Sequence, residues 1–285
     1  MTRILVASDL DRTLVYSAAA LELDMPDRHA PRLLCVEVYQ GRPLSYLTET
    51  AAALLAELGA HPDALFVPTT TRTREQYHRV RLPGPPPRYA ICANGGHLLV
   101  DGVTDPDWQR RVRRTLAAEC APLEQVRAHL RRRADAGWLL KEREAESLFC
   151  YLVVDRALLP ETWVKELADW AAPHGWAVSL QGRKLYVVPR PLTKSAAVAE
   201  IRRRTGAAEV LAAGDSLLDA DLLLAADHAW RPGHGELAAQ GWTAPRVTPL
   251  TSRGVRSGEE ILGAVLARVA APGAPAGGPG RRAPG

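Results

Sequence analysis

Cysteine and lysine are scarce in this 285-residue sequence, and it has no long apolar run. Its four cysteines are far apart, with neither a Cys-x-x-Cys pair nor a histidine cluster, which argues against a zinc site or a disulfide framework. No stretch reaches the roughly 18 uncharged apolar residues that a membrane helix needs. The chain reaches Asp9 too soon for a secretory signal peptide, so we expect a cytoplasmic protein with no membrane partner.

Arginine carries nearly all of the basic charge, and the formal net charge is +4. The lysines are Lys141, Lys165, Lys184 and Lys194. Arginine clusters such as 131–133 could mark a nucleic-acid surface. They are interspersed with acids and accompany no recognised binding motif, so we expect solvated helix faces and no nucleic-acid partner. A mildly positive field also favours an anionic small substrate.

Short apolar runs alternate with amphipathic segments in the first third of the chain. Ile4 to Ala7, Ala64 to Pro68 and Arg88 to Ala93 predict buried strands. Leucines at helical spacing predict a helix over Pro43 to Gly59, and a second helix is expected over Arg74 to Val80. This alternation is typical of parallel βαβ units.

The middle of the chain has a different pattern. Residues 107–135 predict Arg-rich helices, and paired strands flank a further helix at 160–172. The βα pattern then resumes with a helix over 193–205 and a strand over 210–213. We expect an α/β protein whose doubly wound parallel sheet forms a discontinuous core. The expected division is a core of 1–103 and 189–270, an inserted α+β unit of 104–188 and a disordered Pro/Gly/Ala-rich tail of 271–285.

Polar residues follow several of the predicted strands at their carboxyl ends, where ligands bind in such sheets. They are Asp9 and Asp11 after the first strand, Thr69 to Thr71 after the second, and Asp215 with Asp219 after a later one. Lys194 begins another helix. Taken alone, each has a simpler interpretation as a turn residue or a helix cap. A lysine at a helix start opposes the helix dipole, which makes sense only beside an anion.

Together these residues suit phosphoryl transfer. Asp9 and Asp11 are two positions apart, so they face the same side of extended backbone. One carboxylate can attack phosphorus, and the other can act as general acid and base. Crowded carboxylates repel one another, and Mg2+ would neutralise them and the substrate phosphate. Lys194 and a threonine hydroxyl would stabilise the phosphoryl oxygens.

The segment Asp9 to Leu14 resembles the first motif of the haloacid-dehalogenase-like (HAD) phosphatases. Thr70-Thr71-Arg72 is similar to the Thr-Gly-Arg of the Cof-type members, and Asn94-Gly95-Gly96 resembles their Asn-Gly-Ala turn. Leu192 to Ser195 and Gly214 to Asp219 resemble the third and fourth motifs. The resemblance extends over about residues 3–267. It implies a Rossmann-like core with a mixed α/β cap inserted into it, as in sucrose-phosphate and trehalose-phosphate phosphatases.

The resemblance also implies roles for individual residues. Asp9 would be the nucleophile and Asp11 the acid/base, while Thr70 and Lys194 would bind the phosphoryl group. The implied Mg2+ ligands are Asp9, the carbonyl of Asp11, Asp215 and, in support, Asp219. The expected substrate-binding residues are Thr69, Thr71, Arg72, Asn94 and Gly95.

The chain departs from the family pattern at three positions. Arg12 and Thr71 replace glycines, and Leu218 replaces an asparagine. The second departure leaves open whether Thr69 or Thr70 binds phosphate. Residues 15–42 are irregular, with one expected strand at Leu33 to Tyr39. The segment has no clear family counterpart and could form an extra flap.

The sequence thus predicts a Mg2+-dependent phosphomonoesterase for a small phosphorylated metabolite, such as a sugar phosphate. A phosphomutase or phosphotransferase on the same fold is an alternative outcome of the same chemistry. A non-catalytic regulatory module and a nucleic-acid-binding module are further alternatives. The candidate substrate contacts in the cap are Lys141, Arg143, Glu146 and Lys184. The sequence indicates no oligomeric state.

Overall fold

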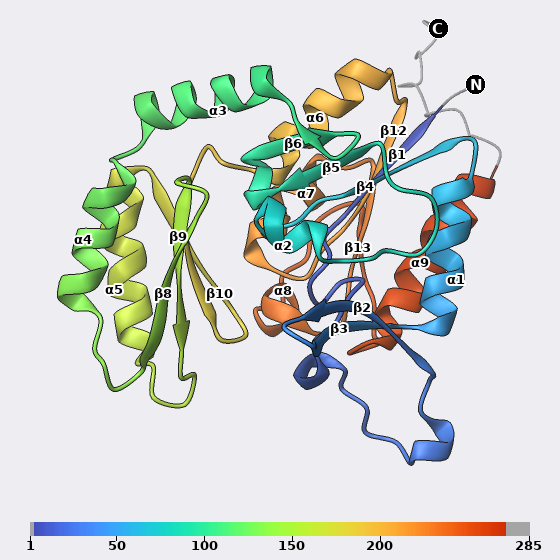
Figure 1. The fold of residues 1–285 in the computed structure, drawn as a ribbon, viewed down its shortest axis with the longest axis horizontal. Coiled ribbons are helices and arrows are strands. Elements are labelled where there is room, and N and C mark those ends of the chain that lie inside the picture. Colours follow the sequence, from blue (N-terminus) through green and yellow to red (C-terminus); the bar gives the residue numbers. More distant parts are fainter. Residues whose placement is uncertain (1–2, 272–285) are drawn as a thin grey trace, which may run out of the picture.

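In the computed structural model, which describes residues 3–271, the chain folds into a core and a cap that lie side by side (Figure 1). The core contains a five-stranded parallel sheet in the order β14-β13-β12-β1-β4. Its strands are β1 (Ile4–Ser8), β4 (Ala64–Pro68), β12 (Glu209–Ala213), β13 (His228–Arg231) and β14 (Val247–Pro249). The expected α/β class and parallel core sheet are confirmed.

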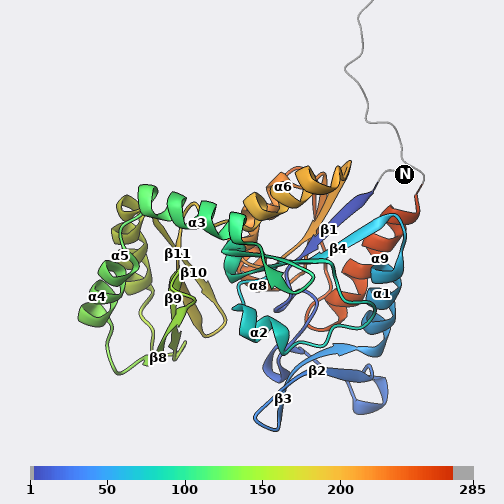
Figure 2. The ribbon, with the colours of Figure 1, turned by 45° about the horizontal axis from the view of Figure 1, so that its top comes forward.

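Helices cover both faces of this sheet. Ile4 and Val6 of β1 pack into one apolar cluster with residues of α1 (Glu49–Ala60) and α9 (Arg256–Ala270). Leu5 and Ala7 point the other way, into a cluster with α6 (Lys194–Thr205) and α7 (Ala220–Ala225). Figure 2 shows α6 on the opposite side of the sheet from α1 and α9. Successive strand residues alternate between faces, which is why β1 is apolar throughout.

The cap has its own antiparallel sheet, in the order β10-β11-β9-β8. Two helices cover its outer face, and a third extends from the core across one end (Figure 1). The cap elements are α3 (Pro106–Glu119), α4 (Leu123–Arg133), β8 (Leu139–Ala145), β9 (Phe149–Val154), α5 (Glu161–Ala171), β10 (Trp176–Gln181) and β11 (Lys184–Pro189). All of them lie within the expected 104–188 unit or end one residue beyond it.

A β-hairpin lies beside the carboxyl end of the core sheet (Figure 1). It consists of the expected strand β2 (Leu33–Tyr39) and of β3 (Arg42–Thr48), which was expected to be helical. The helix predicted from Pro43 begins only at Glu49, because residues 42–48 pair with β2. Thr48 caps the helix by accepting a hydrogen bond from the Ala51 amide at 3.0 Å.

The strand predicted at 88–93 does not join the core sheet. It is β5 (Tyr89–Cys92) of a small antiparallel sheet with β6 (His97–Val100) and β7 (Val103–Thr104). A single bridge, Thr69 to Ile91, links it to the end of β4. The tight turn after Cys92 returns the chain at once, and this favours antiparallel pairing.

The sequence analysis did not predict the short strands β13 and β14 or the helix α8 (Gly235–Ala239). The predicted helix at Arg74 to Val80 is present as α2 (Arg74–His78), which ends two residues earlier. Among the described residues, no helix combines the length and the apolar character that spanning a bilayer requires. Most of the predicted tail, from residue 272 onward, lies outside the described residues.

Candidate active site

Four segments that are distant in sequence converge at the carboxyl ends of the core strands. Asp9 directly follows β1, Thr69 and Thr70 follow β4, and Asp215 follows β12. Lys194 is the first residue of α6 and is fully buried. A buried ammonium group requires partners, and its partners here are two of the predicted acids.

Lys194 joins the segment after β1 to the segment after β12. Its Nζ donates to Asp9 Oδ1 at 2.6 Å and to Asp219 Oδ1 at 2.5 Å. The other oxygen of Asp219 accepts hydrogen bonds from the Asp215 amide at 3.2 Å and from the Ser216 amide at 2.9 Å. Asp219 therefore orients both the lysine and the backbone that carries Asp215.

Gly95 and Asn94 hold the loop that carries Lys194. A Cβ atom on Gly95, where φ is +98°, would lie 2.2 Å from the carbonyl oxygen of Thr193. The side-chain amide of Asn94 donates from Nδ2 to the carbonyl of Leu192 at 2.7 Å. Both residues are buried, and both contact the backbone of the loop that precedes Lys194. Their expected contact with substrate remains a prediction.

The acidic cluster is electrostatically crowded. Burial raises the pKa of Asp9 to about 7, with Asp219 and Asp11 adding to the rise and Lys194 opposing it. Burial, followed by the charges of Asp219 and Asp9, raises the pKa of Asp215 well above its usual range. One lysine thus does not neutralise three buried carboxylates.

The donor set fits a hard divalent cation. Oxygens of Asp9, Asp215 and Asp219 lie within 4.8 Å of one another. Both oxygens of Asp219 accept hydrogen bonds from protein donors, which leaves them less available to a cation. Within the described residues, the Asp215 carboxylate accepts a single hydrogen bond, from Arg12 Nε at 3.3 Å. Asp9 and Asp215 therefore retain oxygens for a metal ion such as Mg2+.

Arg12 has the left-handed backbone conformation, with φ of +64°. That conformation is nearly free for glycine and costs roughly 1–2 kcal/mol for other L-residues. This cost accounts for the glycine at the same place in the motif that the segment resembles. The substitution brings a guanidinium group next to a candidate metal ligand.

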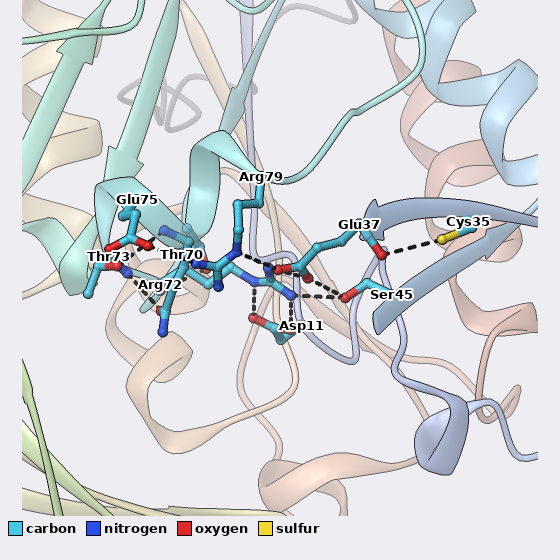
Figure 3. A network of polar contacts seen from close by, with 10 residues as sticks. Asp11, Cys35, Glu37, Ser45, Thr70, Arg72, Thr73, Glu75 and Arg79 are labelled. Carbon is cyan, nitrogen blue, oxygen red and sulfur yellow. Dashed lines mark hydrogen bonds and ion pairs between the residues drawn. The ribbon is translucent and has the colours of Figure 1, made fainter. Parts of the chain in front are cut away.

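Asp11 is held by Arg72 in a two-point ion pair (Figure 3). Arg72 Nε donates to Asp11 Oδ2 at 2.7 Å, and Nη2 donates to Oδ1 at 2.8 Å. Partial burial raises the pKa of Asp11, but the Arg72 charge outweighs this effect and lowers the pKa to about 2. The Asp11 side chain is 39% exposed, so water screens both the effect of burial and the effect of the Arg72 charge on its pKa. The ion pair with Arg72 decides that the pKa is lowered. Arg72 was expected to bind substrate; the described contacts instead direct it to Asp11.

The two candidate threonines differ in their hydrogen bonds. Thr69 Oγ1 donates to the carbonyl of Val67 at 2.9 Å. Thr70 Oγ1 accepts from the Arg72 amide at 3.1 Å, so its hydroxyl hydrogen remains free to donate. This difference favours Thr70 as the phosphate ligand. Thr71 is buried beside them.

The cap approaches the core at two places. Glu146, in the turn after β8, accepts from the Arg74 amide at 2.6 Å and lies 2.5 Å from His97 Nε2. Glu236 of α8 accepts from Ser179 Oγ of β10 at 2.7 Å. Glu146, a predicted substrate contact, thus binds core residues.

Of the other predicted cap contacts, Lys141 and Arg143 are exposed, whereas Lys184 is partly buried at the start of β11. Tyr186 is the main cause that raises the pKa of Lys184 above its usual range, and Asp11 also contributes. Lys184 is thus a cap cation whose charge acts on Asp11.

Two residues near the site were missed by the sequence analysis. Glu37 and Ser45 of the hairpin both contact Arg72. A signal was present, since Glu37 interrupts a run of apolar and neutral residues at a buried strand position.

The chain matches no known protein-family model and no curated protein sequence. Its fold does match solved structures. A sucrose-phosphatase from Synechocystis, in complex with sucrose and phosphate, has a TM-score of 0.65 at 15% identity, covering 94% of this chain and 98% of that one. The C-terminal domain of the C. albicans trehalose-6-phosphate phosphatase has a TM-score of 0.54 at 14% identity, covering 94% and 93%.

A phosphatase of the haloalkanoate (HAD) superfamily from Bacteroides thetaiotaomicron has a TM-score of 0.53 at 15% identity, covering 94% of this chain and 96% of that one. The chain therefore has the fold of the HAD phosphatases, as its motifs predicted. The likeness covers core and cap together.

Proposed function

We propose that this protein is a Mg2+-dependent phosphomonoesterase for small phosphorylated metabolites, with sugar phosphates as the favoured class. The observation that carries the proposal is the buried cluster of Lys194 between Asp9 and Asp219, with Asp215 beside it, at the carboxyl ends of the sheet. Such a cluster is costly to bury and serves no packing purpose, so a site for an anion and a cation is its best explanation.

Asp9 is the proposed nucleophile. Lys194 holds its Oδ1, which leaves the other oxygen to attack phosphorus. A bond then forms between this oxygen and phosphorus as the bond to the leaving oxygen breaks, giving an aspartyl-phosphate. Water attacks the same phosphorus in the second half-reaction, which releases phosphate and restores Asp9. Lys194 and the Thr70 hydroxyl stabilise the charge on the phosphoryl oxygens.

Asp11 is the proposed acid and base. It gives a proton to the leaving oxygen in the first half-reaction and takes one from the attacking water in the second. Paired with Arg72, it is ionised at neutral pH, so the proton it donates has to arrive with the substrate. A phosphomonoester can carry such a proton, because its second pKa is about 6.

Mg2+ would be held by Asp9, Asp215 and the carbonyl of Asp11, with Asp219 orienting this set. When bound, the ion would neutralise the phosphate and the crowded carboxylates. The cap would close over the substrate and exclude bulk water. Two of the similar structures are named for sucrose-phosphate and trehalose-6-phosphate chemistry, which supports a sugar phosphate as the substrate class.

The test is phosphate release from a panel of phosphorylated metabolites with Mg2+ or EDTA. We expect release by the wild type with Mg2+, and none with EDTA or with Asp9→Asn. Asp169→Asn, at an exposed position of the cap helix α5, is the matched control and should behave as wild type. Release that persists in Asp9→Asn would overturn the proposal.

A further inference from the structure

Arg72 lies between the candidate catalytic aspartate and the β2–β3 hairpin (Figure 3). One edge of its guanidinium binds Asp11. Its Nη1 donates to Glu37 Oε2 at 2.7 Å, and its Nη2 also donates to Ser45 Oγ at 3.1 Å. A guanidinium group is planar, so partners on two edges fix both its position and its plane.

Glu37 and Ser45 are a cross-strand pair of the hairpin. Ser45 Oγ donates to Glu37 Oε2 at 2.7 Å, and Arg79 Nε donates to Glu37 Oε1 at 3.3 Å. Glu37 and Ser45 are each only 3% exposed. The Glu37 oxygen that binds Arg72 is therefore itself held by Ser45, and the other oxygen is held by Arg79.

Attachment of the hairpin to the core does not explain this pair. Val36 and Leu47 of the hairpin already pack into the apolar cluster beneath α1 and α9. A buried ion pair is weak grounds for stability, because desolvation offsets its attraction. The distinctive consequence of the Glu37 contact is the orientation of the Arg72 edge that faces Asp11.

We propose that Glu37, supported by Ser45, is a positioning residue for proton transfer by Asp11, acting through Arg72. The hairpin thereby completes the active site from a segment that has no counterpart among the motifs. This inference rests on the proposed phosphatase function. It concerns the geometry of the Asp11 carboxylate in the proton-transfer step, and it leaves Asp9 and Asp215 in their proposed roles.

The test compares two substrates of similar shape, phenyl phosphate and p-nitrophenyl phosphate. Phenolate is a poor leaving group and needs a proton, whereas p-nitrophenolate departs readily without one. kcat/KM reports the steps up to the first phosphoryl transfer, in which that proton is given. For Glu37→Gln we expect kcat/KM to fall about tenfold to a hundredfold on phenyl phosphate. The fall on p-nitrophenyl phosphate should be less than about threefold, and KM should change little on either substrate.

Four further variants test the proposed role of Glu37. Asp11→Asn should show the same selectivity with a larger loss, and adding Glu37→Gln to it should cost nothing more. Ser45→Ala should shift the ratio of kcat/KM for the two substrates in the same direction by a smaller factor. This variant tests the proposal even if Glu37→Gln folds poorly. Leu47→Ala loosens the hairpin without touching Arg72, so it should lower stability and leave the ratio unchanged.

Equal losses on both substrates in Glu37→Gln, or no loss, would overturn this inference while the phosphatase proposal stands. Hydrolysis of neither substrate by the wild type, together with a negative metabolite panel, would overturn the proposed function and this inference with it.

Discussion

Single residues at the site carry either backbone strain or uncompensated charge. Arg12 carries the strain, with its φ of +64°, and its guanidinium lies 3.3 Å from a carboxylate oxygen of Asp215. A cation at this place competes with a metal ion for the same oxygen. The departure from glycine at this position should therefore weaken metal binding as well as stability.

Replacing Arg12 separates these two effects. Arg12→Gly should raise the free energy of unfolding by about 1 kcal/mol, because glycine adopts positive φ without steric cost. It should also lower the Mg2+ concentration for half-maximal binding on the order of tenfold. Arg12→Ala should show the same gain in Mg2+ affinity without the gain in stability, because alanine keeps the steric cost of the positive φ. Chemical denaturation and titration calorimetry measure the two quantities, and an unchanged Mg2+ affinity in both variants would contradict the argument.

At the scale of elements, loops after the strands depend on close backbone approaches. The turn after β5 touches the loop before α6 at a place where only glycine fits. The sequence analysis placed Gly95 in a turn that resembles a family motif. The physical reason for a glycine there appears only in the structure, where the two loops are in contact. The sequence shows a turn residue, and the structure shows what the turn supports.

Gly95→Ala should destabilise the protein by about 2–4 kcal/mol, through the clash with the Thr193 carbonyl and the strained φ. It should also reduce turnover, because Lys194 follows the displaced residue. Gly263→Ala in α9 is the control, since nothing lies within 4 Å of the added Cβ. That variant should raise stability by about 0.5–1 kcal/mol. Equal unfolding free energies for the two variants would refute the close-contact argument.

The turn between β8 and β9 fastens the cap to the core through a carboxylate. Burial raises the pKa of Glu146, but the close contact with His97 and the hydrogen bonds from Arg74 outweigh burial and lower the pKa to about 2. The group's ordinary value is 4.5. A lowered pKa adds stability that is fully present above about pH 4.5 and is lost as the pH falls towards 2.

Glu146→Gln should therefore lower the free energy of unfolding by about 1–3 kcal/mol at neutral pH. The difference from wild type should shrink as the pH falls from 4.5 to about 2. Denaturant titrations across this range measure it. Glu75→Gln, at a side chain that is 83% exposed, should stay within about 0.5 kcal/mol of wild type throughout. A difference that does not vary with pH would show that the ion pair is not its cause.

At the scale of the whole molecule, the chain crosses between core and cap twice, near Asp105 and near Pro191. The candidate site lies at the end of the core sheet, with the hairpin on one side and contacts from the cap on the other. Its crowded carboxylates oppose folding until a cation joins them. The stability of the entire fold should therefore respond to Mg2+.

Mg2+ at about 100 times its dissociation constant should stabilise the protein by about 2.7 kcal/mol, which corresponds to roughly 5 °C in Tm. Asp215→Asn should abolish this response. Without Mg2+ it should be at least as stable as wild type, because it removes a buried charge. Scanning calorimetry measures both effects, with KCl at matched ionic strength as the control. An equal Mg2+ response in Asp215→Asn would place the metal elsewhere.

The sequence by itself determined the α/β class, the parallel core and the residues that gather at its carboxyl edge. Those features follow from local patterns, since apolar runs predict buried strands and a strand's end sets where its next residue lies. Short strands such as β13 and β14 have too few residues to make a pattern. The helix predicted from Pro43 was wrong at its start because pairing with β2 overrides local propensity.

Only the tertiary structure decided which side chains meet. Asp11 and Arg72 are 61 positions apart, and Arg72 and Glu37 are 35 apart. No local pattern encodes a contact across such separations. The expectation that Arg72 binds substrate could therefore be weighed against its pairing with Asp11 only once β1, β4 and the hairpin lay together. The packing of β1, β4 and the hairpin also buries Arg72, and this burial strengthens its ion pair with Asp11.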